Sequence, residues 1–499
     1  SPGSPSATTR AGFAAPRVID GPPPPVPPDV IRRDDQGRTT IRAIKLSEDI
    51  RLDGQLDEQV YHTVPAITGF IQQTPDEGAP ATEKTEAWIL FDERNLYVTA
   101  RIWDSAPPSE WVADEMRRDS MRLVQNDTLT VVFDTFYDRR NGLGFYTNAL
   151  GAVAEFALTN EGNPNVDWNT VWDLRTARFE GGWTVEMEIP FKSLRYQPGP
   201  TQVWGVQLRR NVRRKNEWAY IAPLPISAGS GPVGIFRVSK AATLVGLEVP
   251  QGSRNLEIKP YGIGGLRTDV NAATPTTNVG DGDVGVDIKY GITSNLTLDL
   301  TVNTDFAQVE ADNVQVNLSR FSLFFPEKRE FFLERSGLFE HGAPRQAQTF
   351  FSRRIGLNED ILAGVRVTGQ LGPVSVGALN IETGPGMGDL FGGQSTNNTV
   401  VRARADVLPR ATVGGIVTNL EAPGRSNQAA GVDGQVRFGA NSLVEGWVTQ
   451  VWDSDDALSS AAGQFTTQLG TDKAAVAASY TSIGSTYAPA LGFVRRQDQ

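Results

Sequence analysis

Hydrophobic and polar residues alternate almost strictly along the second half of the chain. In the run NLTLDLTVNTD (295–305), the leucines and Val302 fall on one face of an extended chain, and Asp299 with the threonines falls on the other. The runs GDVGVDIKYG (282–291), TVVRARADVLP (399–409) and AGVDGQVRFG (430–439) repeat the pattern. Strands of about ten residues with this alternation are typical of a membrane β-barrel, with lipid outside and water inside. A soluble antiparallel sandwich or a propeller alternates similarly, and the pattern alone leaves them open.

Shorter strands and more frequent turn signals mark the region from 43 to 245. In TEAWILFDERNLYVTARIWD, the β-rich runs Ala87–Phe91 and Leu96–Trp103 are separated by polar residues, which predicts a hairpin. Only Leu56–His62 and Pro190–Leu194 predict short helical turns. The chain is therefore expected to be all-β.

The expected architecture has two folded parts. A jelly-roll-like β-sandwich at 43–245 precedes an antiparallel membrane β-barrel at 246–499. Trp88, Trp183 and Trp204 stand inside alternating strands of the sandwich and are expected in its core.

Two segments break the strand pattern. Residues 1–42 are rich in proline, glycine and serine, and their GPPPPVPP run is stiff and extended, so we expect a disordered or tethering segment. An insert at 317–345 contains the phenylalanine- and charge-rich run RFSLFFPEKREFFLE. This insert fits a lumen, with charges paired and aromatic rings packed on the barrel wall, or equally a periplasmic turn beneath the barrel.

Composition narrows the function classes. The chain has 499 residues and a formal net charge of −11, so it offers no broad basic surface and no nucleic-acid partner is expected. The absence of cysteine excludes disulfides, thiol catalysis and zinc–thiolate sites. His62 and His341 are the only histidines, which gives no credible triad or zinc site, and spacing singles out no carboxylate pair for glycoside hydrolysis. The mean hydropathy is −0.29, and no apolar run approaches the roughly 18 residues of a transmembrane helix.

Longer motifs carry a family resemblance. The segments LDGQLDEQVYHTVPAITGF, TEAWILFDERNLYVTARIWD, QNDTLTVVFDTFYD and GGWTVEMEIPFKSL resemble the family-nine carbohydrate-binding module, whose fold is a β-sandwich. The segments DTFYDRRNGLGFYTNALG, WGVQLRRNVRRKNEWAYIAP, TDFAQVEAD, RFSLFFPEKREFFLE and FFSRRIG are similar to an uncharacterised bacterial family, the domain of unknown function 5916. In that family such a module precedes an outer-membrane barrel, and the resemblance covers about residues 43–499.

The resemblance implies an exported protein whose signal peptide has been removed. Its barrel would contact outer-membrane lipid, and its sandwich would face the periplasm or the cell surface. We count roughly eleven strands after Pro250, whereas single-chain bacterial barrels normally have an even number. The chain also lacks the terminal aromatic residue of such barrels, so we expect a barrel truncated at its C-terminus.

The resemblance also implies where a sugar would bind. In family-nine modules one sugar-clamping tryptophan precedes the stretch equivalent to Gln125–Thr128, and a second stands late in the module. This chain reads Arg122-Leu123-Val124 at the first place and ISAGSGPVG (226–234) at the second, so both aromatics are missing. Other aromatic residues are candidates for stacking on a sugar ring, and each fits the sandwich core as well: Trp111, Tyr137, Phe145, Trp168 and Trp172.

Structural calcium is the one cofactor that the sequence leaves open. Such modules often hold calcium through carboxylates and carbonyl oxygens, and Asp127, Asp134 and Asp138 lie near one another in the sequence. They lack the spacing of a defined calcium loop, and solvated turn carboxylates explain them as well.

Three functional interpretations follow. The first is an outer-membrane protein whose sandwich binds a polysaccharide or oligosaccharide, while the barrel anchors it or assists solute passage. The alternative is a glycoside-hydrolase-associated protein of polysaccharide catabolism, because family-nine modules are commonly appended to hydrolases of O-glycosyl bonds. No catalytic segment stands out, so no enzymatic activity is assigned. The third is a structural or adhesion protein of the envelope.

Overall fold

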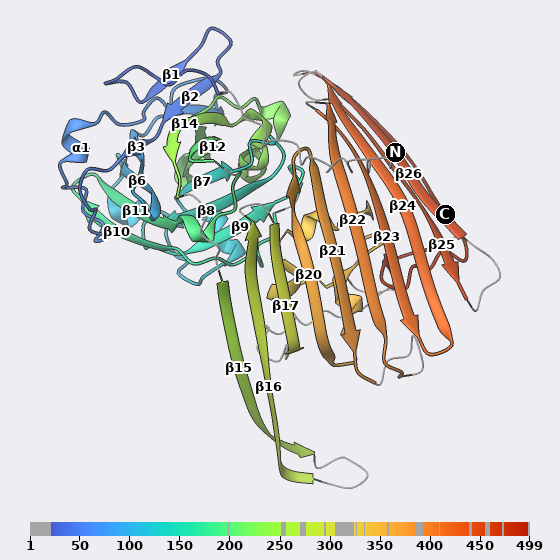
Figure 1. Ribbon diagram of the computed structural model, residues 1–499. Coiled ribbons are helices and arrows are strands. Elements are labelled where there is room, and N and C mark those ends of the chain that lie inside the picture. Colours follow the sequence, from blue (N-terminus) through green and yellow to red (C-terminus); the bar gives the residue numbers. More distant parts are fainter. Residues whose placement is uncertain are drawn as a thin grey trace, which may run out of the picture.

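The computed structural model is an all-β molecule with few helices, in which a sandwich lies beside a long curved sheet (Figure 1). It describes residues 21–162, 164–197, 199–250, 256–269, 276–293, 296–304, 324–325, 327–333, 335–356, 359–385, 393–408, 410–438, 442–454, 460–471 and 474–497. Within these ranges no helix is long and apolar enough to cross a membrane.

Two sheets form the sandwich. Their strands are β1 Ile31–Arg33, β2 Thr39–Arg42, β3 Ile44–Lys45, β4 Ile71–Thr74, β5 Thr85–Phe91, β6 Asn95–Trp103, β7 Thr128–Asp134, β8 Gly142–Asn148, β9 Ala154–Leu158, β10 Asp173–Phe179, β11 Gly182–Pro190, β12 Thr201–Val212, β13 Glu217–Tyr220 and β14 Ala242–Glu248. The larger sheet has the order β1-β2-β14-β12-β7-β8-β9, with β13 joining β12 to β4, and the smaller has the order β10-β11-β6-β5-β3. The hairpin predicted from the sequence is β5–β6. The helix α1 Val60–Thr63 and the 3₁₀ turn η3 Phe191–Ser193 lie in the two segments predicted to be helical.

The main core lies between the two sheets. On β7, Leu129, Val131 and Phe133 point into it, and each is completely buried. Trp183 and Trp204 join the same core, as their alternating strands predicted. Burying such side chains stabilises the fold by about 1.5–3 kcal/mol each.

The larger sheet is also covered on its second face. Val132 of β7 packs there with Tyr146, Trp218 and Ile235 in a separate buried cluster. The covering segment consists of the 3₁₀ turns η5 Ile226–Ala228, η6 Gly231–Phe236 and η7 Val238–Lys240. Because both faces are covered, all seven side chains of β7 are buried.

The prediction of a tether across residues 1–42 is wrong for its last part. Residues 1–20 lie outside the described residues, but β1 and β2 belong to the larger sheet, where β2 pairs in parallel with β14. Ile41 is fully buried and pairs with Leu244. The proline-rich composition of the segment gave no sign of this short strand. The strand is stabilised by pairing with β14, about 200 residues away, rather than by local propensity.

The long sheet follows the sandwich. In the described residues it has eleven antiparallel strands in chain order: β15 Leu256–Asp269, β16 Thr276–Thr293, β17 Leu296–Thr304, β20 Ile361–Leu371, β21 Val374–Thr383, β22 Asn397–Leu408, β23 Ala411–Ala422, β24 Arg425–Phe438, β25 Ser442–Asp453, β26 Ser460–Gly470 and β27 Ala475–Ile483. Over the part of the chain that the structure describes, β15 and β27 do not pair with each other. The sheet is therefore open, and the closed membrane barrel stays a prediction.

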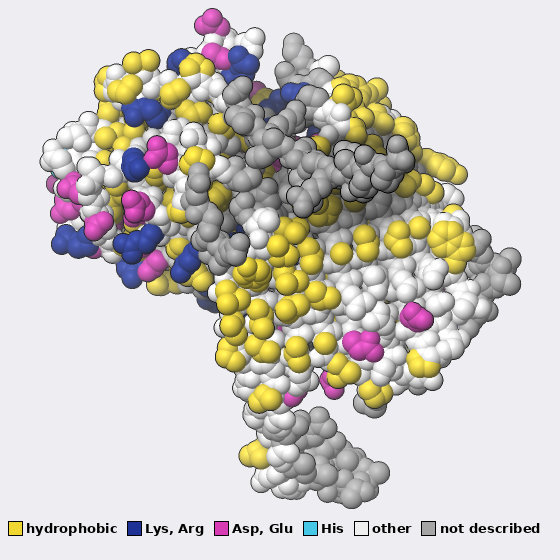
Figure 2. Space-filling model, viewed as in Figure 1, with side chains coloured by type: hydrophobic (Ala, Val, Ile, Leu, Met, Phe, Trp, Pro, Cys, Tyr) yellow, Lys and Arg dark blue, Asp and Glu magenta, His cyan; other side chains and the backbone are white. Residues whose placement is uncertain are grey.

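The two faces of the long sheet differ as the alternation predicted. Val401, Val417, Val432 and Val448 stand on one face, and about half of each side chain is exposed. In the view of Figure 2, charged side chains gather on the sandwich, while the sheet shows mostly hydrophobic and uncharged polar ones. The opposite face carries buried ion pairs, in which Arg366 Nη2 lies 2.9 Å from Asp299 Oδ2 and Arg402 Nη1 lies 2.5 Å from Asp433 Oδ1.

The phenylalanine-rich insert packs against this charged face. It forms α2 Glu330–Leu333, the turn η8 Ser336–Leu338 and the strand β18 Gly342–Ala343. Just after the insert, β19 Ala347–Gln348 pairs with β18 and with β28 Phe493–Val494. Its rings share a buried cluster with strand side chains: Phe331, Phe332 and Phe339 with Ile381, Val400 and Ile416. Of the two arrangements left open by the sequence, aromatic packing on the sheet wall is observed. Residues 317–323 of the insert lie outside the described residues.

Candidate functional site

A cavity of about 1130 Å³ lies between the sandwich and the long sheet. The sandwich contributes the turn before β8, the loop from Trp168 to Trp172, and the η3 region. The facing wall comes from β15, β22, α2 and η8. Ordinary ligand pockets have volumes of about 300–1,000 Å³, so the space is large enough for a small oligosaccharide or a similar ligand.

Three of the five aromatic candidates meet at this cavity. Trp168 and Trp172 line it, and Phe145 lies behind them, with ring centroids 6.2 Å from Trp168 and 5.1 Å from Trp172. Phe145 is completely buried and offers no face to a ligand, so its prediction as a sugar-binding residue is wrong. Trp172 is 7% exposed, whereas Trp168 is only partly buried. Phe136, which is also partly buried, lines the cavity as well, but the Arg335 guanidinium already lies over its ring, 4.9 Å from the centroid. Trp168 is therefore the better candidate for stacking on a ligand.

The buried carboxylate of Glu155 holds Trp172 and the loop before it by hydrogen bonds. The Trp172 indole Nε1–H donates to Glu155 Oε2 at 3.0 Å, and the Thr170 backbone N–H donates to Oε1 at 3.3 Å. Arg118 pairs with the same carboxylate. Burial raises the pKa of Glu155, partly offset by the Trp172 hydrogen bond. Because Thr170 and Trp172 both donate to Glu155, the C-terminal end of the loop that carries Trp168 is fixed to β9.

Polar side chains of the sandwich surround Trp168 in the cavity. Asn169 is exposed next to it, and the Thr170 hydroxyl donates to the Ser193 carbonyl at 3.2 Å. Ser193 in turn donates from its hydroxyl to the Val171 carbonyl at 2.5 Å. An aromatic face bordered by amide and hydroxyl groups suits a sugar ring, whose C–H faces are apolar and whose rim carries hydroxyls.

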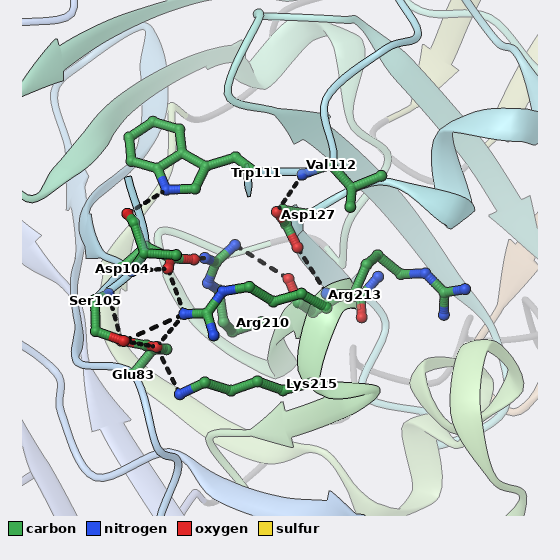
Figure 3. Close-up of polar contacts among 12 residues, drawn as sticks. Glu83, Asp104, Ser105, Trp111, Val112, Asp127, Arg210, Arg213 and Lys215 are labelled. Atoms are coloured by element: carbon green, nitrogen blue, oxygen red, sulfur yellow. Dashed lines mark hydrogen bonds and ion pairs between the residues drawn. The ribbon is translucent and has the colours of Figure 1, made fainter. Parts of the chain in front are cut away.

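Trp111 and Tyr137 do not join this group. The Trp111 indole N–H donates to the Ala106 carbonyl at 3.0 Å, and its ring packs partly against the sandwich core (Figure 3). The Tyr137 hydroxyl lies 2.9 Å from Thr243 Oγ1, and the Arg139 guanidinium stacks 4.3 Å above its ring. Neither residue lines the cavity.

The three calcium candidates are not one ligand set. Asp127 and Asp134 flank β7, roughly 20 Å apart along the strand. Asp127 accepts the backbone N–H groups of Val112 and Arg213 at 2.8 and 2.7 Å (Figure 3). Asp134 accepts the N–H of Asp138 at 3.0 Å, while burial raises its pKa. These carboxylates stabilise turns, and the described residues contain no group of three or more potential metal ligands.

The basic run RNVRRKNEW (210–218) is neutralised inside the sandwich. Arg214 Nη2 lies 2.5 Å from both Glu83 Oε1 and Asp104 Oδ1, and Lys215 Nζ lies 2.6 Å from Glu83 Oε1 (Figure 3). Burial raises the pKa of Glu83, but Lys215, Ser105 and Arg214 outweigh this and lower it to about 2. The run is thus a structural ion-pair network rather than a free anion site.

The two positions where the resemblance implied sugar clamps are both buried. Leu123 from the first position and Ala228 from the second both belong to the buried cluster on the second face of the larger sheet. Leu123 is completely buried and Ala228 is 9% exposed. Buried apolar side chains therefore stand at the two positions, and neither offers an exposed face to a sugar.

The comparisons with known proteins agree with a two-part chain. Residues 52–218 match the model described as carbohydrate family 9 binding domain-like, and residues 254–363 match the domain of unknown function DUF5916. Among curated proteins none matches the sequence.

Solved structures show only a distant likeness. A family 9 module from Caldicellulosiruptor kristjanssonii in complex with cellotriose has 14% identity and a TM-score of 0.29, covering 42% of this chain and 95% of its own. A candidate carbohydrate-binding protein from Bacteroides uniformis has 9% identity and a TM-score of 0.34, covering 42% and 98%. At these scores the likeness supports no argument by itself. Residues 52–218 are therefore similar to the carbohydrate family 9 binding domain and lie in the packed sandwich, and residues 254–363 are similar to DUF5916.

Proposed function

We propose that this protein binds a glycan in the cavity between the sandwich and the long sheet, with the sheet held in the bacterial outer membrane. The observation that carries the glycan site is the position of Trp168. Trp168 is one of two partly buried aromatic residues that line the cavity, and the other, Phe136, is covered by the Arg335 guanidinium. Trp168 is bordered by polar side chains and belongs to the module whose family match supports glycan binding. The binding surface therefore differs from the buried clamp positions on the larger sheet.

The long sheet supports the membrane part of the proposal. Its outward face exposes valines on neighbouring strands, and such a face is costly in water but suited to lipid. Its other face carries paired charges and the packed insert, as expected for a face turned away from lipid. In this arrangement the sheet anchors the protein and the sandwich presents the glycan site.

A glycan array with the full chain in detergent tests the binding claim. We expect binding that Trp168→Ala weakens at least tenfold, about 1.4 kcal/mol, because stacking on the ring is lost. Trp452→Ala is the matched control, since Trp452 is an exposed tryptophan on the long sheet outside the cavity. No glycan binding, or equal weakening by both variants, would contradict the proposal. Release of reducing sugar from a bound glycan would instead favour the alternative of a protein acting in polysaccharide catabolism.

A further inference from the structure

Two arginines from opposite walls enter the cavity. Arg140 belongs to the turn between β7 and β8 of the sandwich, and Arg404 belongs to β22 of the long sheet. The two guanidinium groups lie within electrostatic range of each other. Two like charges beside a cavity repel each other; Asp406 and Asp433 offset part of this repulsion, and negative charge on a ligand would offset more.

The hydrogen bonds of Arg140 leave one donor unused. Its Nη2 donates to Asp406 Oδ1 at 2.5 Å, whereas its Nη1 is buried and has no hydrogen-bond partner among the described residues. A buried donor without a partner is costly, typically by about 1–3 kcal/mol. Asp406 therefore accepts a hydrogen bond from Nη2 of Arg140 but not from Nη1.

Arg404 has a neutral partner in place of a carboxylate. Its Nε and Nη2 both donate to the Thr412 hydroxyl, at 3.3 and 3.0 Å. In the described part of the chain its guanidinium makes no ion pair. Lys192 is an exposed cation on the sandwich wall, and in total eight lysines and arginines but four carboxylates line the cavity. Some of these cations are already paired, as Lys259 is with Glu257 and Glu330 at 3.1 and 2.6 Å.

We infer that Arg140 and Arg404 together bind an acidic group of the ligand, so that the glycan is an acidic one, bearing a carboxylate or a sulfate. Guanidinium groups match the planar, multiple acceptors of such oxyanions better than other side chains do. Asp406 keeps Nη2 of Arg140, so Arg404, which makes no ion pair among the described residues, donates to the ligand oxygens, and the charge of Arg140 adds to the attraction. This inference rests on the proposed glycan site and names its substrate class.

Matched pairs of oligosaccharides test it by calorimetry on the full chain in detergent. One pair is oligogalacturonate and its methyl ester, and the other is sulfated and unsulfated dextran oligosaccharide. We expect the charged member of at least one pair to bind at least tenfold more tightly than its neutral partner, and this preference to shrink as salt rises. Arg404→Gln should remove the preference, because it weakens binding of the charged member at least tenfold more than binding of the neutral member. Arg175→Gln, an exposed arginine on β10 outside the cavity, is the control.

The outcomes separate the two claims. Equal affinity for the charged and neutral members of both pairs would overturn the acidic-ligand inference and leave the glycan site standing. Failure of all four oligosaccharides to bind would overturn both. If Arg404→Gln does not fold, the unmodified chain still decides, because a preference for the charged member that does not change with salt would overturn the role of the two arginines.

Discussion

The guanidinium of Arg140 and the carboxylate of Asp406 join the sandwich to β22 of the long sheet, with 2.5 Å between Nη2 and Oδ1. Both side chains are largely buried. A second link stands on β24, where Arg437 Nη1 lies 3.2 Å from Glu161 Oε2. The two walls of the cavity are therefore fixed to each other by charge, although they come from different parts of the chain.

Removing one partner of the Arg140–Asp406 pair should loosen this junction. Arg140→Ala and Asp406→Ala each leave a partly buried charge without its partner, and in a double-mutant cycle we expect a coupling energy of about 1–3 kcal/mol. Unfolding of the four proteins in urea gives the cycle. Strictly additive effects would show that the ion pair does not hold the two parts together.

Glu186 on β11 should make the stability of the sandwich depend on pH. Burial raises its pKa to about 7, although its Oε2 accepts the N–H groups of Asp53 and Gly54 at 3.0 and 2.7 Å. Between its ordinary pKa of 4.5 and this value, the folded protein keeps a proton that the unfolded chain releases. The contribution of this group is thus complete below about pH 4.5 and lost as the pH rises through 7.

Glu186→Gln isolates that contribution. The amide stays neutral, so its melting temperature relative to the unmodified protein should rise as the pH increases from 4.5 to 8, by an amount corresponding to at most about 3 kcal/mol. Glu248→Gln, which changes an exposed carboxylate paired with Lys45, is the control. A difference between Glu186→Gln and the unmodified protein that does not vary with pH would refute the assignment.

Gly144 should tolerate no side chain. It stands on β8 directly opposite Phe156 of β9, and a Cβ at this position would overlap the phenyl ring. Gly144→Ala should therefore lower the free energy of unfolding by about 1–3 kcal/mol, as overpacking does in a closed core. Adding Phe156→Leu should recover part of the loss. Chemical unfolding measures both, and an unchanged midpoint for Gly144→Ala would contradict the packing described.

If the valine face of the long sheet contacts lipid, a charged side chain placed on that face should destabilise the protein, most strongly at the middle of the membrane. Val417 is 53% exposed in the middle of β23, and Val417→Arg should destabilise the membrane-inserted form by about 2–4 kcal/mol. Val233→Arg, at a similarly exposed valine on the sandwich, should have little effect. Heat-modifiable migration after refolding into lipid vesicles reports the inserted form. Equal behaviour of the two variants would argue against lipid contact at Val417.

Local pattern predicted the elements of this fold well and the site less well. The alternation in 295–305 and in 399–409 identified β17 and β22 with the correct face for each residue, because a two-residue period is a local property. Trp168 and Arg404 are 236 residues apart, and only docking of the two parts puts them around one cavity. No local signal distinguishes the partly exposed Trp168 from the buried Phe145, since both stand in aromatic-rich segments and differ only in what packs over them.

The most direct test of the central claim asks whether a ligand occupies the cavity. Because the chain contains no cysteine, Lys192→Cys introduces a single thiol at the cavity wall, and Lys84→Cys introduces one on the exposed surface of the sandwich away from it. The rate of maleimide labelling is then measured with and without a saturating glycan identified by the array. We predict that the glycan slows labelling of Lys192→Cys severalfold and leaves Lys84→Cys unchanged. Equal labelling of Lys192→Cys with and without bound glycan would contradict binding at this site.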